Sequence, residues 1–322
     1  MGTVSNVLNH PEKVLPDTVS KVLASIDSLG FIRNDAARQL RAGRSKTIGL
    51  VVLDVSNPFF TAVARGAEDK ANAAGLSVLL GNSDDDVTRE SAYLDLFEEQ
   101  RVHGVLVSPF GEIGPRLEDL RRRGIPAVLV DRSGDDSRFS SVSVDDVAGG
   151  RLAVEHLLAQ GRTRIAFLAG SSDIRQVRER LQGARDAIAT HPGSTLEVID
   201  VEALTVIAGR IAGEQLLARS AAERPDGIFC SNDLVAVGVL QALVMLGNVR
   251  IPEEIALVGY DDIDFASATV VPLTSIRQPA QLIGQTAIEI LLEEADDPSL
   301  EPRHVVFQPE LVVRHSTAGN QR

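Results

Sequence analysis

Strand and helix patterns alternate from Thr47 almost to the end of the chain, and this alternation limits the possible folds more than any other feature. Short apolar runs rich in Val, Ile and Leu alternate with segments whose apolar residues recur at helical spacing. The predicted strands are 47–55, 77–80, 104–108, 127–130, 164–169, 197–201, 227–230 and 255–258, and the helices between them include 60–74, 88–100, 148–159, 179–189, 208–218 and 234–246. Such a pattern indicates parallel sheets covered by helices on both faces and joined by right-handed crossovers. We therefore predict an α/β fold with doubly wound parallel sheets.

The predicted strands are too many for one compact doubly wound domain. The rhythm changes at 140–145, where a strand-like segment follows another strand without a helix between them. Strand pieces at 273–276 and 304–313 flank a predicted helix at 280–294, which indicates that the chain crosses between two halves more than once. Within a body spanning 47–322, we predict one subdomain from about 47–144 plus 277–303 and another from about 145–274 plus 304–316.

The first 46 residues differ from the body in charge. The net charge is −13, yet these residues carry seven Lys and Arg against four Asp and Glu, a balance of +3 that leaves −16 for the rest. Short helices at 3–8 and about 16–29 precede a helix with a small apolar face, Ala36, Ala37 and Leu40, and a basic linker at 41–46. A solvated basic segment is one interpretation. A small basic head that attracts phosphate, on an acidic body that repels it, is the better one.

Several classes of protein lack support in the sequence. No apolar run reaches the ~18–20 residues of a membrane span, and residues 1–9 do not resemble a signal peptide. The single cysteine, Cys230, fits a reducing compartment, so we expect a cytoplasmic protein with no membrane partner. Because phosphate-binding and nucleophile motifs are missing and the histidines lack metal-ligand spacing, we expect no catalysis, no cofactor and no metal. The run Asp84-Asp85-Asp86 is interpreted as a solvated turn rather than a cation site.

Polar and aromatic residues follow the predicted strands. Ligands of open α/β sheets bind beyond the carboxyl ends of the strands. The residues found there are Asn57, Phe59, Phe60, Asp131, Arg132, Asp145, Asp146, Ser171, Ser172, Arg175, Arg178, Asn232, Asp233, Asp261, Asp262 and Gln278. Each alone has a structural explanation, such as helix capping by Asn57 or Asp131, a core position for Phe59 or Phe60, or a solvated charge at Arg178. Together they predict a site for a small polyhydroxylated ligand, because amides, carboxylates and guanidinium groups bind hydroxyls and aromatic faces cover a sugar ring.

A resemblance to a known family adds to this interpretation. The motifs are TVSNVLN, DTVSKVLASIDSLGFIRNDAARQLRAGRSKTIGLVV, DVSNPFF, QRVHGVLVSP, VDDVAGGRLAVEHLLAQG, RERLQG, CSNDLVAVGVLQAL, IPEEIALVGYDD and PLTSIRQP. In this order, and over nearly the whole chain, they resemble the LacI/GalR family of bacterial transcription regulators. The resemblance implies a helix-turn-helix head at 1–33, a hinge helix and linker at 34–46, and a dimerising, effector-sensing body of the type I periplasmic-binding-protein kind at 47–322.

The resemblance also implies which residues contact DNA. Thr3, Ser5 and Asn6 match the DNA-facing positions of a recognition helix. The hinge positions that match are Ala37, Arg38, Leu40 and Arg41, with Leu40 as an apolar wedge in the minor groove. The chain departs from the family because it begins at TVSNVLN, without the first helix and turn of the head. Either the true start lies upstream, or the head is truncated and the protein senses its ligand without gripping DNA.

In the body, the resemblance extends to the sugar-sensing members and to the ribose-binding periplasmic protein. The positions that match pentose-binding residues are Asn57, Phe59, Phe60, Asp131, Arg132, Arg178, Asn232, Asp261 and Gln278. Asp146 stands where that protein has asparagine, and Leu204 replaces a stacking aromatic. The implied effector is a monosaccharide. A nucleobase is the alternative, because purine-sensing members share much of this frame.

The function that follows is a ligand-controlled repressor. It would bind a pseudo-palindromic operator as a homodimer and respond to a small sugar held between its two subdomains. The alternatives are a sugar-binding protein that serves a transporter and a sugar sensor deficient in DNA binding. An enzyme with a nucleotide cofactor is the remaining class, which the missing phosphate loop argues against.

Overall fold

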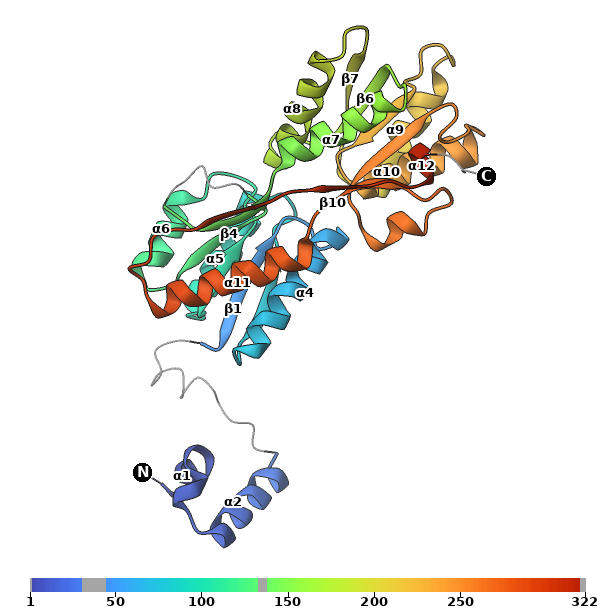
Figure 1. The fold of residues 1–322 in the computed structure, drawn as a ribbon. Coiled ribbons are helices and arrows are strands. Elements are labelled where there is room, and N and C mark those ends of the chain that lie inside the picture. Colours follow the sequence, from blue (N-terminus) through green and yellow to red (C-terminus); the bar gives the residue numbers. More distant parts are fainter. Residues whose placement is uncertain (1, 31–44, 133–137, 319–322) are drawn as a thin grey trace. The chain divides into compact units, whose positions relative to one another are not determined.

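The computed structural model describes residues 2–30, 45–132 and 138–318 of the chain. These residues divide between two compact units, Met1–Ser45 and Lys46–Arg322. Figure 1 shows both units, coloured along the sequence. The smaller unit contains α1 (Thr3–Asn9), a 3-10 turn (Pro11–Lys13) and α2 (Pro16–Ser28). The predicted hinge helix and most of its linker lie outside the described residues.

The small unit has little core, as its short helices predict. Val7 of α1 is buried, with 4% of its surface exposed, whereas α2 has no buried residue. The apolar face predicted on α2 is only partly covered, since Leu23 is 49% exposed and Leu29 is 79% exposed. The described part of the head therefore buries too little apolar surface to be a firm domain by itself.

The larger unit begins with a parallel sheet. We call this sheet and the helices that pack against it the first lobe. Its six strands are ordered β11 (His304–Phe307), β5 (Ser141–Val144), β4 (Ala127–Val130), β3 (Gly104–Val107), β1 (Thr47–Val52) and β2 (Ser77–Asn82). One face packs against α4 (Pro58–Ala73) and α11 (Ala280–Asp296), and the other against α5 (Val87–Glu99) and α6 (Gly114–Arg122). Because successive strand residues point to opposite faces, both faces are apolar and the strands read as continuous Val, Ile and Leu runs.

The second lobe repeats this plan around another sheet. Its order is β12 (Glu310–Val312), β10 (Thr274–Arg277), β9 (Ala256–Asp261), β8 (Gly227–Cys230), β6 (Arg164–Ala169) and β7 (Thr195–Asp200), with only β12 antiparallel to its neighbour. The helices α7 (Asp146–Ala159) and α8 (Arg175–Ala189) cover one face. The opposite face packs against α9 (Val206–Ala218) and α10 (Asp233–Gln241), which continues as a π-helical turn (Ala242–Leu246). A 3-10 turn (Asp264–Ser267) follows β9, and α12 (His315–Ala318) ends the described chain. The predicted α/β class with parallel sheets is confirmed.

The chain passes between the lobes after β5, after β10 and between β11 and β12 (Figure 1). From the sequence we predicted that 304–316 belongs to the second subdomain. This is wrong for His304–Phe307, which pairs in parallel with Ser141–Val144 of the first sheet. Only β12 joins the second sheet. The apolar alternation of 304–313 looks continuous, so the sequence pattern does not reveal that it is divided between two sheets.

Candidate functional site

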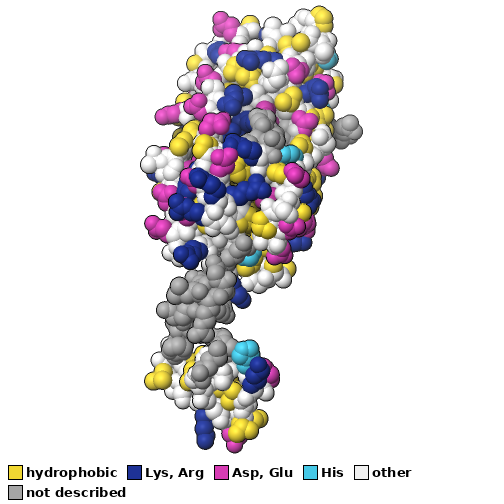
Figure 2. All heavy atoms as spheres, turned by 90° about the vertical axis from the view of Figure 1, so that its left-hand side faces the viewer, with side chains coloured by type: hydrophobic (Ala, Val, Ile, Leu, Met, Phe, Trp, Pro, Cys, Tyr) yellow, Lys and Arg dark blue, Asp and Glu magenta, His cyan; other side chains and the backbone are white. Residues whose placement is uncertain are grey.

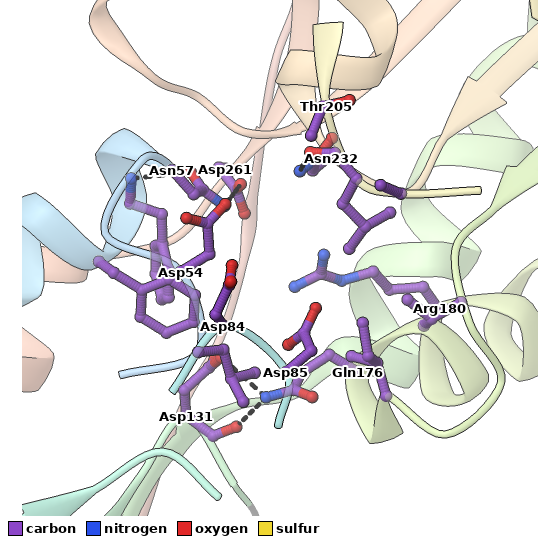
Figure 3. A pocket seen from close by; sticks show the side chains of 17 residues that line it. Asp54, Asn57, Asp84, Asp85, Asp131, Gln176, Arg180, Thr205, Asn232 and Asp261 are labelled. Atoms are coloured by element: carbon purple, nitrogen blue, oxygen red, sulfur yellow. Dashed lines mark hydrogen bonds between the residues drawn. The ribbon is translucent and has the colours of Figure 1, made fainter. Parts of the chain in front are cut away.

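A cavity of about 130 Å³ lies where the carboxyl ends of both sheets meet. Its lining comes from both lobes (Figure 3). Of the residues predicted to bind an effector, six line it: Asn57, Phe59, Phe60, Asp131, Asn232 and Asp261. The volume is well below the ~300–1,000 Å³ of pockets for drug-sized ligands, so the cavity suits a single small ring.

The first wall of the cavity is formed where β1 leads into α4. Asn57 caps α4, and its Oδ1 accepts a hydrogen bond from the Phe59 amide at 3.0 Å. The cap directs the first helical turn so that Phe59 and Phe60 are buried beside the cavity, in edge-to-face contact with ring centroids 5.0 Å apart. The capping and core roles considered for these residues are therefore real, and the same residues also line the cavity.

Two carboxylates stand at strand ends in backbone conformations that are rare for residues other than glycine. Asp131 follows β4 with φ 56°, and Asp261 ends β9 with φ 106°. Strained backbone of this kind is concentrated at functional sites. Asp131 Oδ2 accepts from Gln176 at 2.8 Å, whereas its Oδ1 is buried and has no hydrogen-bond partner among the described residues. An acceptor left open in this way is suited to a ligand hydroxyl.

Burial shifts the acidity of both carboxyl groups. It raises the pKa of Asp261 to about 6, against the opposing effects of Arg180 and of hydrogen bonds from Asn57 and Gln278. Burial also raises the pKa of Asp131 well above its usual range, and the nearby Asp146 carboxylate adds to this shift. Perturbed carboxyls that face a cavity are typical of functional sites.

The Asp261 shift predicts a pH effect on stability. Native Asp261 keeps its proton up to about pH 6, whereas the unfolded chain releases it near 3.8, so the native state binds more protons between these values. The free energy of unfolding should therefore fall as pH rises through this window. In urea titrations, Asp261→Asn should remove up to about 1.4 kcal/mol per pH unit of that slope. Asp69→Asn, at an exposed carboxylate of α4, is the control, and equal slopes for Asp261→Asn and wild type would contradict the prediction.

Arg180 reaches the cavity from α8, on the side opposite Asp54 and Asp84 (Figure 3). Its Nε donates to Asp146 Oδ1 at 2.7 Å and its Nη1 to the Ser231 carbonyl at 2.6 Å. The guanidinium carbon lies 3.7 Å from the centroid of the Tyr260 ring. The side chain is buried, and these contacts hold its planar donors in a single orientation.

Arg178, the arginine predicted for the site, does not line the cavity. It is exposed and donates to the backbone carbonyls of Ser172 and Asp173. Two residues along an α-helix correspond to about 200° of rotation, so Arg178 and Arg180 lie on opposite faces of α8. The sequence predicted that this helix begins at 179, which left Arg178 outside it. The observed α8 begins at Arg175 and therefore includes Arg178.

Three other predicted residues do not line the cavity. Asp146 pairs with Arg180, and Gln278 donates to Asp261 Oδ1 at 2.8 Å. Arg132 donates to the Gly111 carbonyl at 2.7 Å. Asp146 and Gln278 thus orient side chains that do face the cavity.

Sequence reasoning missed several lining residues. Gln176 and Arg180 are inside a helix rather than at a strand end, and Asp54 lies just beyond the end of β1. Asp84 and Asp85 lie in a turn, as the solvated-turn interpretation expects, and Asp86 caps α5. Asp84 and Asp85 also line the cavity. Burial and the carboxylates of Asp54 and Asp84 raise the pKa of Asp85 to about 6. Among the described residues, no group of acidic, His or Cys side chains is arranged to hold a metal.

Comparisons with known proteins bear on this site. Residues 154–317 match the family model of a periplasmic binding protein-like domain. The chain is 35% identical over 319 residues to the HTH-type transcriptional repressor PurR of Photobacterium profundum, covering 98% of this chain and 94% of that protein. In the described part of the chain, no helix is long and apolar enough to cross a membrane.

Two solved structures are similar over most of their length. A LacI family transcriptional regulator from Enterococcus faecium with bound ribose has a TM-score of 0.77 and 28% identity, covering 85% of this chain and 100% of that chain. The lac repressor dimer bound to operator and the anti-inducer ONPF has a TM-score of 0.82 and 27% identity, covering 98% and 94%.

The fold, the cavity between its lobes and these similarities define the class: a transcriptional regulator built on a periplasmic-binding-protein-like body. The chain belongs to the LacI/GalR family, as the sequence motifs predict. Its relatives are transcriptional repressors rather than enzymes, and the interpretation as a transporter-linked binding protein is not favoured.

Proposed function

We propose that this chain is a cytoplasmic, non-catalytic repressor that binds operator DNA as a homodimer and is controlled by a monosaccharide bound between its lobes. The observation that carries the sugar assignment is the composition of the cavity. It combines an open carboxylate acceptor at Asp131 Oδ1, the fixed donors of Arg180 and the buried rings of Phe59 and Phe60. Hydroxyls need donors and acceptors together, and the C–H face of a sugar ring needs an apolar wall.

The remaining cavity residues fit the same ligand. Asn232 uses its Oδ1 to cap α10 and its Nδ2 to bond the Leu204 carbonyl at 3.1 Å, so it supports the wall that Leu204 forms. Asp261 is held by Asn57 and Gln278. We propose that Asp131, Arg180 and Asp261 bind ligand hydroxyls directly, that Asp146 and Gln278 act through Arg180 and Asp261, and that Arg178 has no part.

We propose that DNA is bound by the head and the hinge, and not by the body. Thr3 is exposed on α1, with Ser5 and Asn6 half-buried beside it, and the hinge residues Ala37, Arg38, Leu40 and Arg41 lie outside the described residues. Figure 2 shows Lys and Arg interleaved with Asp and Glu on one face of the larger unit. Several arginines of the larger unit are paired, for example Arg116 with Asp95 and Glu98, and paired arginines attract phosphate weakly.

The regulatory step follows from the two-lobed body. A sugar that contacts both lobes stabilises the arrangement in which the lobes are in contact through it. In a dimer, this shift changes the distance between the two DNA-binding heads. The lac repressor dimer bound to operator supports a dimeric arrangement for this chain as well.

The first test is ligand binding by the full chain. D-Ribose and other monosaccharides, with guanine and hypoxanthine as the nucleobase alternative, are screened by thermal unfolding and calorimetry. A monosaccharide at about 100 times its Kd should add about 2.7 kcal/mol to the free energy of unfolding. Arg178→Met should keep this response and Asp131→Asn should lose it. Stabilisation by a nucleobase and by no sugar would replace the proposed effector class.

Operator binding is tested by selecting DNA from random duplexes with the full chain. The selected sites should be two-fold symmetric, and their affinity should change when the stabilising sugar is added. Failure to select any sequence, with intact sugar binding, would favour a sensor deficient in DNA binding.

A further inference from the structure

A direct hydrogen-bonded contact joins the two lobes at one side of the cavity. Asp131 follows β4 of the first lobe, and Gln176 is in the first turn of α8 in the second lobe. The Gln176 Nε2 donates both to Oδ2 of Asp131, at 2.8 Å, and to the Asp131 backbone carbonyl (Figure 3). Both residues are buried, with 7% of the surface of Gln176 and 4% of that of Asp131 exposed. We call this pair the interlobe bridge.

The bridge constrains Asp131 in two ways at once. A bond to the carbonyl holds the backbone where φ is 56°, and a bond to Oδ2 holds the carboxylate plane. The other carboxylate oxygen, Oδ1, is then left beside the cavity, buried and without a partner among the described residues. Hydrogen bonds in a buried environment of low dielectric constant are stronger than exposed ones.

Other contacts between the lobes are less specialised. Asn57 Nδ2 reaches Asp261 Oδ2 at 3.2 Å, but the same Asn57 also caps α4, so its position is set within its own lobe. Phe110 packs against the cores of both lobes through apolar contact, which has no fixed geometry. In contrast, Gln176 does not cap its own helix, and both bonds from its Nε2 cross between the lobes.

We propose that Gln176 is a positioning residue that joins the lobes through Asp131 and presents Asp131 Oδ1 to the ligand. The second part of this role rests on the proposed sugar-binding function, and the first does not. Without the bridge, the arrangement in which the two lobes are in contact loses stability relative to one in which they are separated. The ligand affinity falls with the population of the joined arrangement.

The test measures the distance between the lobes without any ligand. Spin labels are placed on cysteines introduced at the exposed positions Glu99 in α5 and Ala189 in α8, while Cys230 stays buried and unlabelled. The labelled full chain, mixed with an excess of unlabelled protein so that a dimer carries labels on one protomer, should give one narrow distance distribution. Gln176→Leu removes the amide at similar volume and should broaden the distribution and shift it. An unchanged distribution in Gln176→Leu would overturn the proposal.

A matched control is available on the same helix. Gln182 is exposed, and its Nε2 donates to Asp186 one turn along α8, so it makes a glutamine hydrogen bond that does not cross between lobes. Gln182→Leu should leave the distance distribution as in the labelled parent. A similar change in both variants would show that damage to α8 is the cause, and would also overturn the proposal.

A pH series separates positioning from simple packing. In Gln176→Glu the introduced carboxyl faces Asp131, which Asp146, Arg180 and Asp261 influence, and the other charged groups of the lining are Asp54, Asp84 and Asp85. Two carboxyls at hydrogen-bond distance share one proton at low pH and repel each other when both are ionised. The lobes should be joined at pH 5 and separated at pH 8, whereas a distribution independent of pH would contradict the proposed contact.

The final measurement uses the monosaccharide that stabilises the protein, with D-ribose as the first probe. Gln176→Leu should weaken binding by about tenfold to hundredfold, mostly through faster dissociation, whereas Gln182→Leu should not change it. Unchanged affinity in Gln176→Leu would refute the presentation of Asp131. If the distances respond as expected but no sugar binds the parent, the bridge stands and the proposed effector class fails.

Discussion

Arg180→Met is expected to lower the free energy of unfolding by about 3–5 kcal/mol at neutral pH, because it leaves the Asp146 carboxylate buried without its partner. Asp146 and Arg180 are both almost fully buried, and their ion pair is 2.7 Å long. Methionine preserves most of the apolar volume over the Tyr260 ring, so the loss reports the charge pair rather than a cavity. The measurement is urea unfolding of the full chain followed by circular dichroism.

Two further variants define the cause of this loss. Arg178→Met makes the same substitution at an exposed site two residues away and should change stability by less than about 0.5 kcal/mol. Asp146→Asn combined with Arg180→Met removes both charges and should regain part of the loss, since the uncompensated buried charge is gone. If Arg180→Met is no less stable than Arg178→Met, the buried pair does not stabilise the second lobe. Both variants that lack Arg180 should fail to respond to the sugar.

Gly183→Ala is the second variant with a large expected effect, a loss of about 3 kcal/mol, at the upper end of overpacking costs. A Cβ at this position would lie 1.9 Å from the Val147 carbonyl oxygen of α7, and one at Gly150 would lie 2.0 Å from the Arg180 carbonyl oxygen. The two helices therefore cross in backbone contact, and added methyl groups would force them apart. Such a shift would move Gln176 and Arg180 away from the cavity, so sugar affinity should fall together with stability.

The control for this variant is Gly111→Ala. A Cβ at Gly111 would lie 3.4 Å from the nearest atom, in Val87, which is ordinary contact. This substitution should be neutral or slightly stabilising, because alanine restricts the unfolded chain. Equal stability of the two alanine variants in urea unfolding would show that the α7 and α8 crossing tolerates separation.

Individual residues show how much of the cavity lining the local sequence pattern predicts. The strand that ends before Ser56-Asn57-Pro58 and the helix that follows are both visible in the sequence, so Asn57, Phe59 and Phe60 were assigned to the cavity. Asp131, Asn232 and Asp261 were found for the same reason, since each stands at the end of an apolar strand. Arg180 and Gln176 were missed because they lie inside α8 and not at a strand end, and only tertiary packing decides which face of α8 meets the other lobe.

Local sequence thus determined the α/β class, the repeated sheets and the strand-end half of the cavity, because hydrophobic periodicity and turn residues act over a few residues. Tertiary structure alone decided which groups meet across the lobes. Gln176 and Asp131 are 45 residues apart in the chain, and Asn57 and Asp261 are 204 apart. It also decided that β11 and β12 belong to different sheets. Contacts of this range depend on how helices pack and where the chain recrosses between the sheets, and no local pattern contains that information.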